Sequence, residues 1–532
     1  MAFINIYTNN LTRQLRNTEI TNRNWVFVPG TTITGSPDVI YEFTSLRDFL
    51  DTCGSYGPEG SLTHTYISGI LSAGLPVLFK RITKNDLDPE NVKEVKKAKT
   101  VFSHTDAATE EEVVDFEVYE KFGGTYGNNL YITLRDTGSA IWIDVNYNKL
   151  STLESKRIIT YNSTTETRAQ INEKLIAALQ SVNTESGKII FDRIDIVVKN
   201  TDTATFTFLS EKNRQLQGGE DLDEDYVSAM IPQVYDYENG PLKDKMLYQP
   251  EFLTSGGYTD TIASTTNPIA TAMKNLSLYR QDCRALIDLP VDLDKTEQLT
   301  KARELVYQQA SNTQVIPSAS ICAPWCYMQV GSLQEWMPPS YVYLTVVGNA
   351  LNVNNNAIYA PKAGLAFGRI QNIIKPQFEI GSDICEAWQT DGDAQINPIM
   401  KVQSGSYVIM GNSTLLMKDT YNEEENAFSE SSADLTIIEI KRYVYNLATE
   451  LQYRYNSAES FETFALSTAT YLNQMKSVGA VTQYDIVNIS SSDEPRKLKV
   501  LINVYLSPTI KNIEIYLNVS YGTINVSSGG VE

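Results

Sequence analysis

Gly74-Leu75-Pro76-Val77-Leu78-Phe79-Lys80-Arg81-Ile82 is a glycine-proline turn followed by a strand-like apolar run. It comes directly after residues 62–73, where apolar residues recur at helical spacing. A helix that passes through a tight turn into an apolar strand is typical of α/β proteins, whose strands are buried on both faces. This stretch therefore predicts an α/β domain.

The same kind of pattern appears on both sides of this stretch. Upstream, Trp25-Val26-Phe27-Val28-Pro29-Gly30 predicts a buried strand that ends in a turn. Downstream, Ala285-Leu286-Ile287-Asp288-Leu289-Pro290 predicts another buried strand. Asp294 follows, with Glu297 three residues later, which is a capping-box signal for a helix. Strands and helices that alternate in this way predict a sheet with helices on its faces.

The composition changes near residue 84, where polar and charged stretches replace the buried strands. Beyond them, apolar and polar residues alternate, as in the run Leu130/Ile132/Leu134, and a period of two predicts strands with one face in water. We also expect a strand at 203–209 and a helix capped by Ser163-Thr164-Thr165-Glu166. Residues 84–250 are therefore predicted to form an inserted β-rich domain.

The pattern changes again beyond residue 365. One predicted helix has an apolar seam with steps of three and four, formed by Ile437, Ile440, Val444, Leu447 and Leu451. A second helix is expected at 458–478, and strands are expected at 498–506 and 513–519.

The predicted fold class is α+β or α/β multidomain, with α/β domains, an inserted β-rich domain and extended terminal arms. Its predicted parts are an N-terminal arm (1–22), a middle α/β domain in two segments (23–83 and 251–365), an inserted outer domain (84–250), a C-terminal α/β core domain (366–506) and a C-terminal arm (507–532).

The charge of the chain excludes some classes of partner. The 532 residues include 44 Lys and Arg against 64 Asp and Glu, a net charge of −20. Such a chain is a poor nucleic-acid binder, because binding a polyphosphate needs a basic surface. Both ends carry more basic than acidic residues, which would suit arms that dock on acidic neighbours; chance fluctuation is the alternative.

Catalytic, metal and membrane signals are weak. His64 and His104 are the two histidines, and no phosphate-loop, GxSxG or HExxH motif occurs. Cys322 and Cys326 could be half of a metal site, but the five cysteines are more typical of buried free thiols in a reducing cytoplasm. No signal peptide and no apolar run of about 18 residues is found. We expect no enzyme, cofactor, metal or membrane insertion.

The chain resembles contractile tail sheath proteins of bacteriophages. The most specific match is the turn Gly124-Thr125-Tyr126-Gly127-Asn128-Asn129-Leu130. Further matches follow in family order at 45–50, 73–82, 255–257, 285–290, 323–325, 338–340, 360–364, 396–399, 411–415, 441–443 and 477–481. The chain departs from the family at Lys441, where an arginine is expected, and at Phe461, where a tryptophan is expected.

The resemblance implies a structural subunit of a contractile tail sheath, located in the virion and assembled in the bacterial cytoplasm. Such subunits stack as homo-hexameric rings around a tail tube in an extended, metastable state. They contract on a baseplate trigger and drive the tube through the host envelope for genome ejection. The implied partners are further copies, the tube, baseplate proteins, and tail terminator or neck proteins. The alternative is the sheath of a non-viral device, a tailocin or a type VI-like system.

Such a sheath needs links between subunits that survive large rotations, and strands added to a neighbour's sheet would supply them. We assign these links to the strand-competent residues of the two arms, Phe3, Ile4, Ile6, Tyr7, Ile513, Ile515, Leu517 and Val519. The alternative is that the last strand pairs only within its own chain.

A second expectation concerns the tube. Lys441, Arg442 and Arg454 are candidates to face an acidic tube surface, because the resemblance places the C-terminal domain on the inside. Ordinary solvated helix charges are the alternative for these three residues. A multidomain α/β enzyme or a sugar-binding module without a recognisable motif is the competing class for the whole chain.

Overall fold

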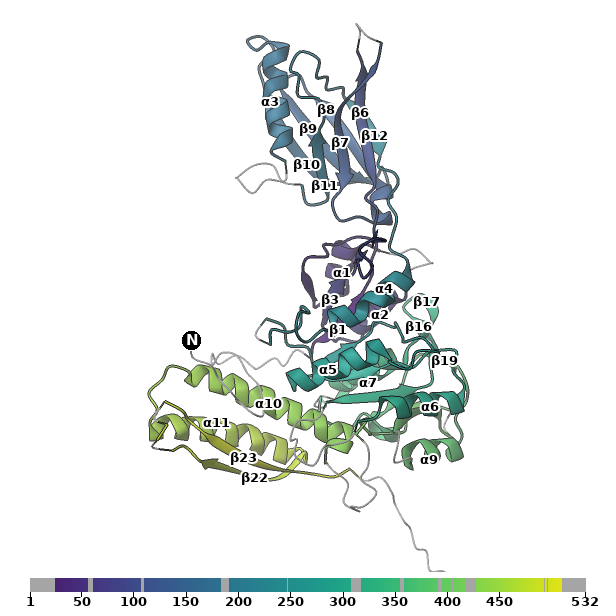
Figure 1. Cartoon of the computed structure of the whole chain (residues 1–532), viewed down its shortest axis with the longest axis vertical. Helices are drawn as coiled ribbons and strands as arrows, with labels where there is room; N and C mark the ends of the chain where they lie inside the picture. The colour runs from purple at the N-terminus through teal and green to yellow at the C-terminus, as the bar shows by residue number, and fades with distance from the viewer. Residues whose placement is uncertain are drawn as a thin grey trace, which may run out of the picture.

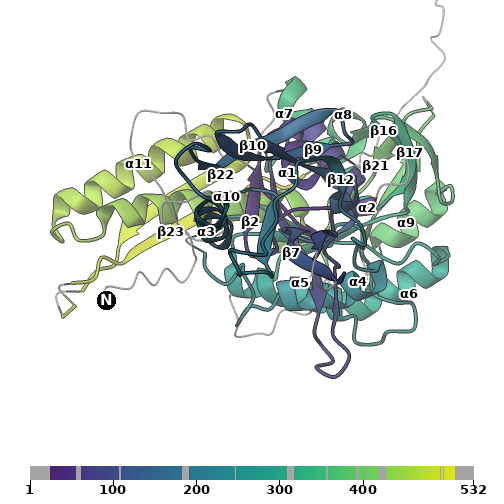
Figure 2. The same cartoon turned by 90° about the horizontal axis from the view of Figure 1, so that it is seen from above.

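The computed structural model describes residues 24–55, 61–106, 110–182, 191–245, 247–307, 317–354, 358–390, 395–403, 405–416, 427–491, 493–494 and 496–509. Figure 1 shows an upper β-rich part, an α/β part below it, and a group of helices and strands that projects to one side at the bottom. Figure 2 shows from above that this last group extends away from the α/β part.

The α/β part is built on a nine-stranded sheet with the order β18-β21-β20-β15-β14-β13-β1-β3-β2. In chain order its strands are β1 (Val26–Gly30), β2 (Ile40–Phe43), β3 (Val77–Arg81), β13 (Phe252–Thr254), β14 (Arg284–Ile287), β15 (Ala319–Ala323), β18 (Arg369–Ile370), β20 (Ile396–Lys401) and β21 (Tyr407–Ile409). The strands from β20 to β3 run parallel, and antiparallel strands close both ends. The three apolar runs singled out in the sequence form β1, β3 and β14 in the parallel region.

Helices pack on both faces of this sheet, which explains why its strands are continuously apolar. One face is covered by α1 (Leu46–Cys53), α2 (Leu62–Ser72) and α7 (Pro339–Asn354). The other face is covered by α4 (Glu224–Val234), α5 (Pro268–Arg280), α6 (Lys295–Leu305) and α9 (Ser382–Thr390). Within β1, Val26 and Val28 face the first group of helices and Phe27 faces the second.

The β-rich part contains two packed antiparallel sheets and one helix. The first sheet has the order β10-β9-β8-β12, from β8 (Leu130–Asp136), β9 (Ala140–Tyr147), β10 (Ser151–Thr160) and β12 (Glu211–Gln215). The second has the order β11-β7-β6, from β6 (Lys99–Thr105), β7 (Glu112–Glu120) and β11 (Ile194–Val198). Helix α3 (Arg168–Gln180) packs with them, and the 3-10 helix η1 (Thr125–Asn129) precedes β8.

Two details of the β-rich part differ from the sequence prediction. Residues 203–209 form no strand; the strand in this region is β12, which begins at Glu211. Helix α3 begins after Thr167, whose side chain makes a capping box with Gln170, and not at the Ser163 motif. Each of these polar stretches contains several neighbouring residues that can cap a helix or form a turn. Residue spacing alone therefore predicted a strand where none forms and the wrong start for helix α3.

The chain enters and leaves the β-rich part at neighbouring positions. The short strands β4 (Lys84–Asn85) and β5 (Lys93–Glu94) precede the crossing, where Lys96 N–H donates to the Glu220 carbonyl at 2.9 Å. Arg81 fixes the joint, because its guanidinium donates to the Gly35 carbonyl at 2.6 Å and to the Gly123 carbonyl at 2.8 Å. The two parts are thus joined by two neighbouring segments of the chain, by the buried Arg81, and by further hydrogen bonds such as that from Arg193 to the Asp51 carbonyl at 3.1 Å.

The structure moves two of the predicted domain boundaries, those at residues 250 and 365. Residues 222–250 were assigned to the insertion, but Leu222, Val227 and Ile231 pack in the core of the α/β part. Residues from 366 were assigned to the C-terminal domain, but β18, β20 and β21 complete the nine-stranded sheet. The reason is that α4 and β20 bury their apolar side chains against strands that are distant in the sequence.

The remaining elements flank the α/β part or form the projecting group. A small sheet has the order β17-β16-β19, from β16 (Cys326–Val330), β17 (Leu333–Met337) and β19 (Ile373–Pro376), and α8 (Gly364–Phe367) lies near β18 and β21. The projecting group follows the 3-10 helix η2 (Ala427–Ser429) and consists of α10 (Ser431–Leu451), α11 (Ala458–Ser477), β22 (Val481–Asn488) and β23 (Val500–Leu506).

Candidate assembly surface

The projecting group has a small apolar core of its own. Helix α11 begins where the Ser457 side chain accepts the Ser460 N–H at 3.3 Å, a standard N-cap. The core side chains come from α10, α11 and the start of β22, and are Ile440, Val444, Leu447, Phe464, Leu472, Met475 and Val481. The two helices therefore form an antiparallel pair on which β22 and β23 rest.

Strands β22 and β23 pair antiparallel with each other, and neither pairs with another strand among the described residues. The inner face of this sheet, with Tyr484, Ile486 and Ile502, packs toward the helices, whereas Val487, Leu501 and Tyr505 on the outer face are exposed. A two-stranded sheet is marginally stable by itself, and its unpaired edges can accept further strands.

The pairing pattern shows which backbone groups of β22 are available. Ile489 N–H donates to the Lys499 carbonyl at 2.9 Å, and Ile486 lies opposite Ile502. Because hydrogen-bonded and non-hydrogen-bonded pairs alternate in an antiparallel ladder, the N–H and C=O groups of Tyr484 and Ile486 point away from β23. The outer edge of β22 therefore presents the donors and acceptors that an added strand requires.

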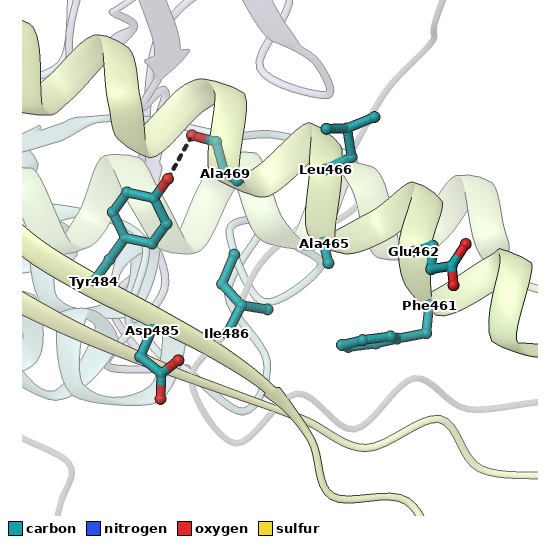
Figure 3. Close-up of a pocket in the computed structure, with 8 residues that line it drawn as sticks. All are labelled: Phe461, Glu462, Ala465, Leu466, Ala469, Tyr484, Asp485 and Ile486. Carbon is teal, nitrogen blue, oxygen red and sulfur yellow. Dashed lines mark hydrogen bonds between the residues drawn. The ribbon is translucent and has the colours of Figure 1, made fainter.

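A shallow groove of about 550 Å³ runs between this edge and α11 (Figure 3). Its helical side consists of Phe461, Glu462, Ala465, Leu466 and Ala469, and its strand side consists of Tyr484, Asp485 and Ile486. The Tyr484 hydroxyl donates to the Ala469 carbonyl at 3.4 Å, which fixes the strand against the helix. The small alanine side chains leave room there for apolar side chains of an added segment.

The first half of α10 anchors the projecting group to the α/β part through buried charges. Arg284 on β14 donates to the Asp434 carboxylate at 2.5 Å, and its guanidinium is fully buried. Ser318 also donates to Asp434, while Leu435 and Ile438 pack against the sheet. Buried ion pairs tolerate little displacement, because a shifted partner leaves an uncompensated charge.

Arg442 belongs to this anchor. Its guanidinium contacts the Glu251 carboxylate, lies 3.8 Å from Glu439 and donates from Nε to the Asp282 carbonyl at 3.1 Å. Burial raises the pKa of Glu251 well above its ordinary value; the positive charge of Arg442 opposes this and nearby Glu439 reinforces it. The tube-facing role predicted for Arg442 is inconsistent with this placement, since its charge is used inside the chain.

The other two basic candidates differ from each other. Lys441 Nζ donates to the Gln281 side chain at 3.1 Å, and burial lowers the pKa of its ammonium group. Arg454, in the loop between α10 and α11, is exposed. The structure thus does not bring the three candidates together on one surface, and contact with a tube stays a prediction for Lys441 and Arg454.

The arm residues predicted to add to neighbouring sheets lie outside the described ranges. They are Phe3, Ile4, Ile6, Tyr7, Ile513, Ile515, Leu517 and Val519. What the structure adds is a candidate receiving site, the β22 edge with its groove. Sequence reasoning missed β22, although Tyr484, Ile486 and the preceding Gly479 are a weak signal of a turn and an alternating strand.

The side chains that could take part in catalysis or metal binding have structural roles. His64 Nε2 lies 3.0 Å from the Gly54 carbonyl, and His104 Nδ1 lies 2.7 Å from Asp115. Burial raises the pKa of the Cys322 thiol to about 12, so this side chain is a poor nucleophile or ligand. In the described ranges no group of three or more His, Cys, Asp or Glu side chains could hold a metal ion.

Among the helices in the described part of the chain, none combines the length and the apolar character needed to cross a bilayer.

The fold has known counterparts among solved structures. A sheath tail protein from Listeria innocua aligns with a TM-score of 0.58 and 12% identity, over 92% of this chain and 96% of that chain. A sheath tail protein from Desulfitobacterium hafniense aligns with a TM-score of 0.54 and 10% identity, over 95% of this chain and 100% of that chain. No protein-family model and no curated protein matches the sequence. At these identities the similarity establishes the fold.

Proposed function

We propose, from the sheath tail protein fold that this chain adopts, that it is the structural subunit of a contractile tail sheath. Copies polymerise around a tail tube in an extended, metastable state and contract when a baseplate triggers them. Contraction drives the tube through the host envelope for genome ejection. The chain then works as a mechanical part of a virion, without catalysis and without a cofactor.

The observation that carries this proposal is the sheet of β22 and β23, which pairs with no further strand among the described residues, with the groove beside it. A sheet with free edges supplies backbone hydrogen bonds to a partner, and the groove supplies contacts for the partner's alternate side chains. The strand-competent arms at 3–7 and 513–519 are the segments proposed to occupy such edges on neighbouring copies. Links of this kind hold subunits together while their bodies rotate.

The proposal has a direct test. Deletion of residues 1–20 should leave a folded monomer that cannot polymerise, because the N-terminal link is removed. Negative-stain electron microscopy of purified protein measures this as the loss of long hollow cylinders, and circular dichroism checks the fold. Normal cylinders from the truncated chain would contradict the arm role, and discrete particles from the full chain would contradict the sheath proposal.

The groove allows a point-variant test of the receiving site. Leu466 is 71% exposed on the rim of the groove, so Leu466→Glu should change the stability of the monomer by no more than about 0.5 kcal/mol. A carboxylate there should disfavour docking of an apolar segment and reduce cylinder formation. The matched control is Thr463→Glu, because Thr463 is exposed on the same helix outside the groove. Equal cylinder yields from both variants would remove the groove from the proposal.

A tube contact is the second element of the proposed assembly. Arg454 is the exposed basic candidate, so Arg454→Glu should weaken sheathing of an acidic tube. Arg442→Glu is unsuitable for this test, because it would place a third carboxylate beside Glu251 and Glu439. The same assembly serves a phage tail or a non-viral injection device, and neighbouring capsid genes would distinguish the two.

A further inference from the structure

Helix α10 joins the projecting group to the α/β part, and two buried glutamates meet at this joint. Figure 1 shows α10 running from the α/β part into the projecting group. Glu439 lies on α10, and Glu251 directly precedes β13 in the interior of the nine-stranded sheet. Their exposed fractions are 1% and 0%. We refer to these two residues as the glutamate pair.

The sheet holds Glu251 in a fixed position. Its N–H donates to the Trp25 carbonyl at 2.7 Å, and its carbonyl accepts the Arg284 N–H at 2.9 Å. The Oε2 atom of its side chain contacts Arg442 on α10, whereas Oε1 has no hydrogen-bond donor among the described residues. A buried carboxylate oxygen without a donor is costly, because water does not replace the missing hydrogen bond.

The helix brings one cation and one further carboxyl to Glu251. Glu439 and Arg442 are three residues apart and therefore lie on the same face of α10. The Arg442 guanidinium contacts Glu251 and lies 3.8 Å from Glu439. Burial raises the pKa of Glu251, and Glu439 raises it further by its charge and as a hydrogen-bond partner. Two ionised carboxylates only accept hydrogen bonds, so a bond between these two side chains requires a proton.

The other cations near the glutamate pair have partners of their own. Arg280 donates to Asp282 through two hydrogen bonds of 2.9 Å, and Arg284 pairs with Asp434. Burial lowers the pKa of two nearby ammonium groups, which make no ion pair with a carboxylate of the described residues, those of Lys245 and Lys441. Arg442 is therefore the cation that directly contacts the pair.

The remaining titratable groups around the glutamate pair are uncharged. Burial raises the pKa of each, so that at neutral pH they are one thiol and three hydroxyls, those of Cys283, Tyr359, Tyr443 and Tyr471. None of these groups supplies a charge that balances a second carboxylate. With both glutamates ionised, two negative charges would share one guanidinium, an arrangement that favours the uptake of a proton.

We propose that Glu251 and Glu439 share one proton, and that this proton holds the first half of α10 on the nine-stranded sheet. The protonated carboxyl donates to the ionised one, and the single negative charge is paired with Arg442. Loss of the proton leaves two facing carboxylates, whose repulsion favours detachment of α10. The joint is thus a latch that loosens as the pH rises. This inference concerns one chain by itself and does not depend on assembly.

The direction of the pH dependence follows from comparing the docked and the detached helix. When α10 detaches, both glutamates enter water and ionise above about pH 4.3. The docked state keeps one proton to a higher pH, because the pKa of Glu251 is raised. The latch is complete below about pH 4 and is lost as the pH rises through the raised pKa. In this range the equilibrium constant for detachment increases by up to about tenfold per pH unit, since each event releases one proton.

The test measures hydrogen exchange of the α10 amides in the full chain by mass spectrometry. Glu439→Gln is the decisive variant, because an amide donates to the Glu251 carboxylate as the protonated acid does and does not titrate. The ratio of protection in this variant to protection in the unaltered chain, compared at the same pH, should rise by up to about tenfold per pH unit. Glu459→Gln is the matched control, because Glu459 is exposed at the start of α11. The control should exchange like the unaltered chain at every pH.

Each outcome decides the inference. Protection that falls with pH in the unaltered chain and in the control, but not in Glu439→Gln, supports the latch. The same pH dependence in Glu439→Gln and in the unaltered chain overturns it, even if the variant is less stable. Because glutamine reproduces the protonated acid, failure of both Glu439→Gln and Glu251→Gln to fold, judged by circular dichroism, also overturns it. The sheath proposal is tested by cylinder formation and stands or falls separately.

Discussion

Arg442 carries its positive charge into the interior, beside the carboxylates of Glu251 and Glu439. Arg442→Met should lower the free energy of unfolding by about 3–5 kcal/mol, because it leaves buried carboxylates without a counter-ion. Urea unfolding at pH 7 measures this loss. Arg454→Met is the control and should change stability by less than about 0.5 kcal/mol, since Arg454 is exposed. Equal effects of the two substitutions would contradict the anchoring role of Arg442.

Asp288 makes the stability of the chain depend on pH. Burial raises the pKa of this carboxyl to about 7, although Ser340 donates to it from the backbone N–H at 2.7 Å and from Oγ at 2.5 Å. The folded state therefore binds a proton that the unfolded state has lost above a pH of about 4. The stability contributed by the protonated acid is complete below about pH 4 and is lost as the pH rises to about 7.

Asp288→Asn removes this titration. The stability of the unaltered chain relative to the variant should fall by up to about 4 kcal/mol between pH 4 and pH 8, with most of the change below pH 7. Urea unfolding of both proteins at several pH values measures the difference. A difference that stays constant with pH, or that grows in favour of the unaltered chain, would contradict the assignment.

At the scale of elements, the start of helix α3 shows the difference between a cap predicted from a local motif and the cap that the folded chain uses. The Thr167 side chain accepts the Gln170 N–H, whereas Ser163 lies before the helix begins. Thr167→Ala should therefore reduce the free energy of unfolding by about 1 kcal/mol, and Ser163→Ala should have a smaller effect. Thermal unfolding of the two variants measures this order. A larger effect of Ser163→Ala than of Thr167→Ala would indicate that the helix starts at the Ser163 motif.

Elements formed by strong local patterns could be predicted from the sequence. Strands β1, β3 and β14 are continuous apolar runs between turns, and α6 begins at the predicted Asp294 cap. Strand β22 was missed because half of its residues face water and its apolar residues are few. The domain to which α4 and β20 belong depends on strands that are distant in the sequence and that pack against them. Local residue spacing contains no information about such partners.

The candidate site could be predicted only in outline. Of the predicted seam of α10, Ile440, Val444, Leu447 and Leu451 lie in the core of the projecting group, yet the seam did not reveal that the first half of this helix is buried almost all round. Arg442 therefore looked like a surface cation in the sequence. The groove depends on Ala465, Ala469 and the position of β22, which only the packed structure brings together.

At the scale of the whole molecule, the β-rich part should be removable. Lys96 and Glu220 are hydrogen-bonded neighbours at the crossing, so a short Gly-Ser linker can replace residues 97–219. The shortened chain should fold with a lower melting temperature, because Arg81 loses the carbonyls of Phe122 and Gly123. Differential scanning calorimetry and electron microscopy measure stability and cylinder formation. An insoluble product would show that the two parts fold only together.

The edges of β22 and β23, unpaired in the part of the chain that the structure describes, also affect how a pool of unassembled chains behaves. Each chain exposes a template for pairing, and its charge of −20 keeps like chains apart by mutual repulsion. Spontaneous growth then has a nucleation barrier that a pre-existing seed bypasses. Added salt screens the repulsion, so the lag before unseeded growth should shorten as ionic strength increases. The unassembled protein should therefore behave like a charge-stabilised colloid, which stays dispersed until a seed is present.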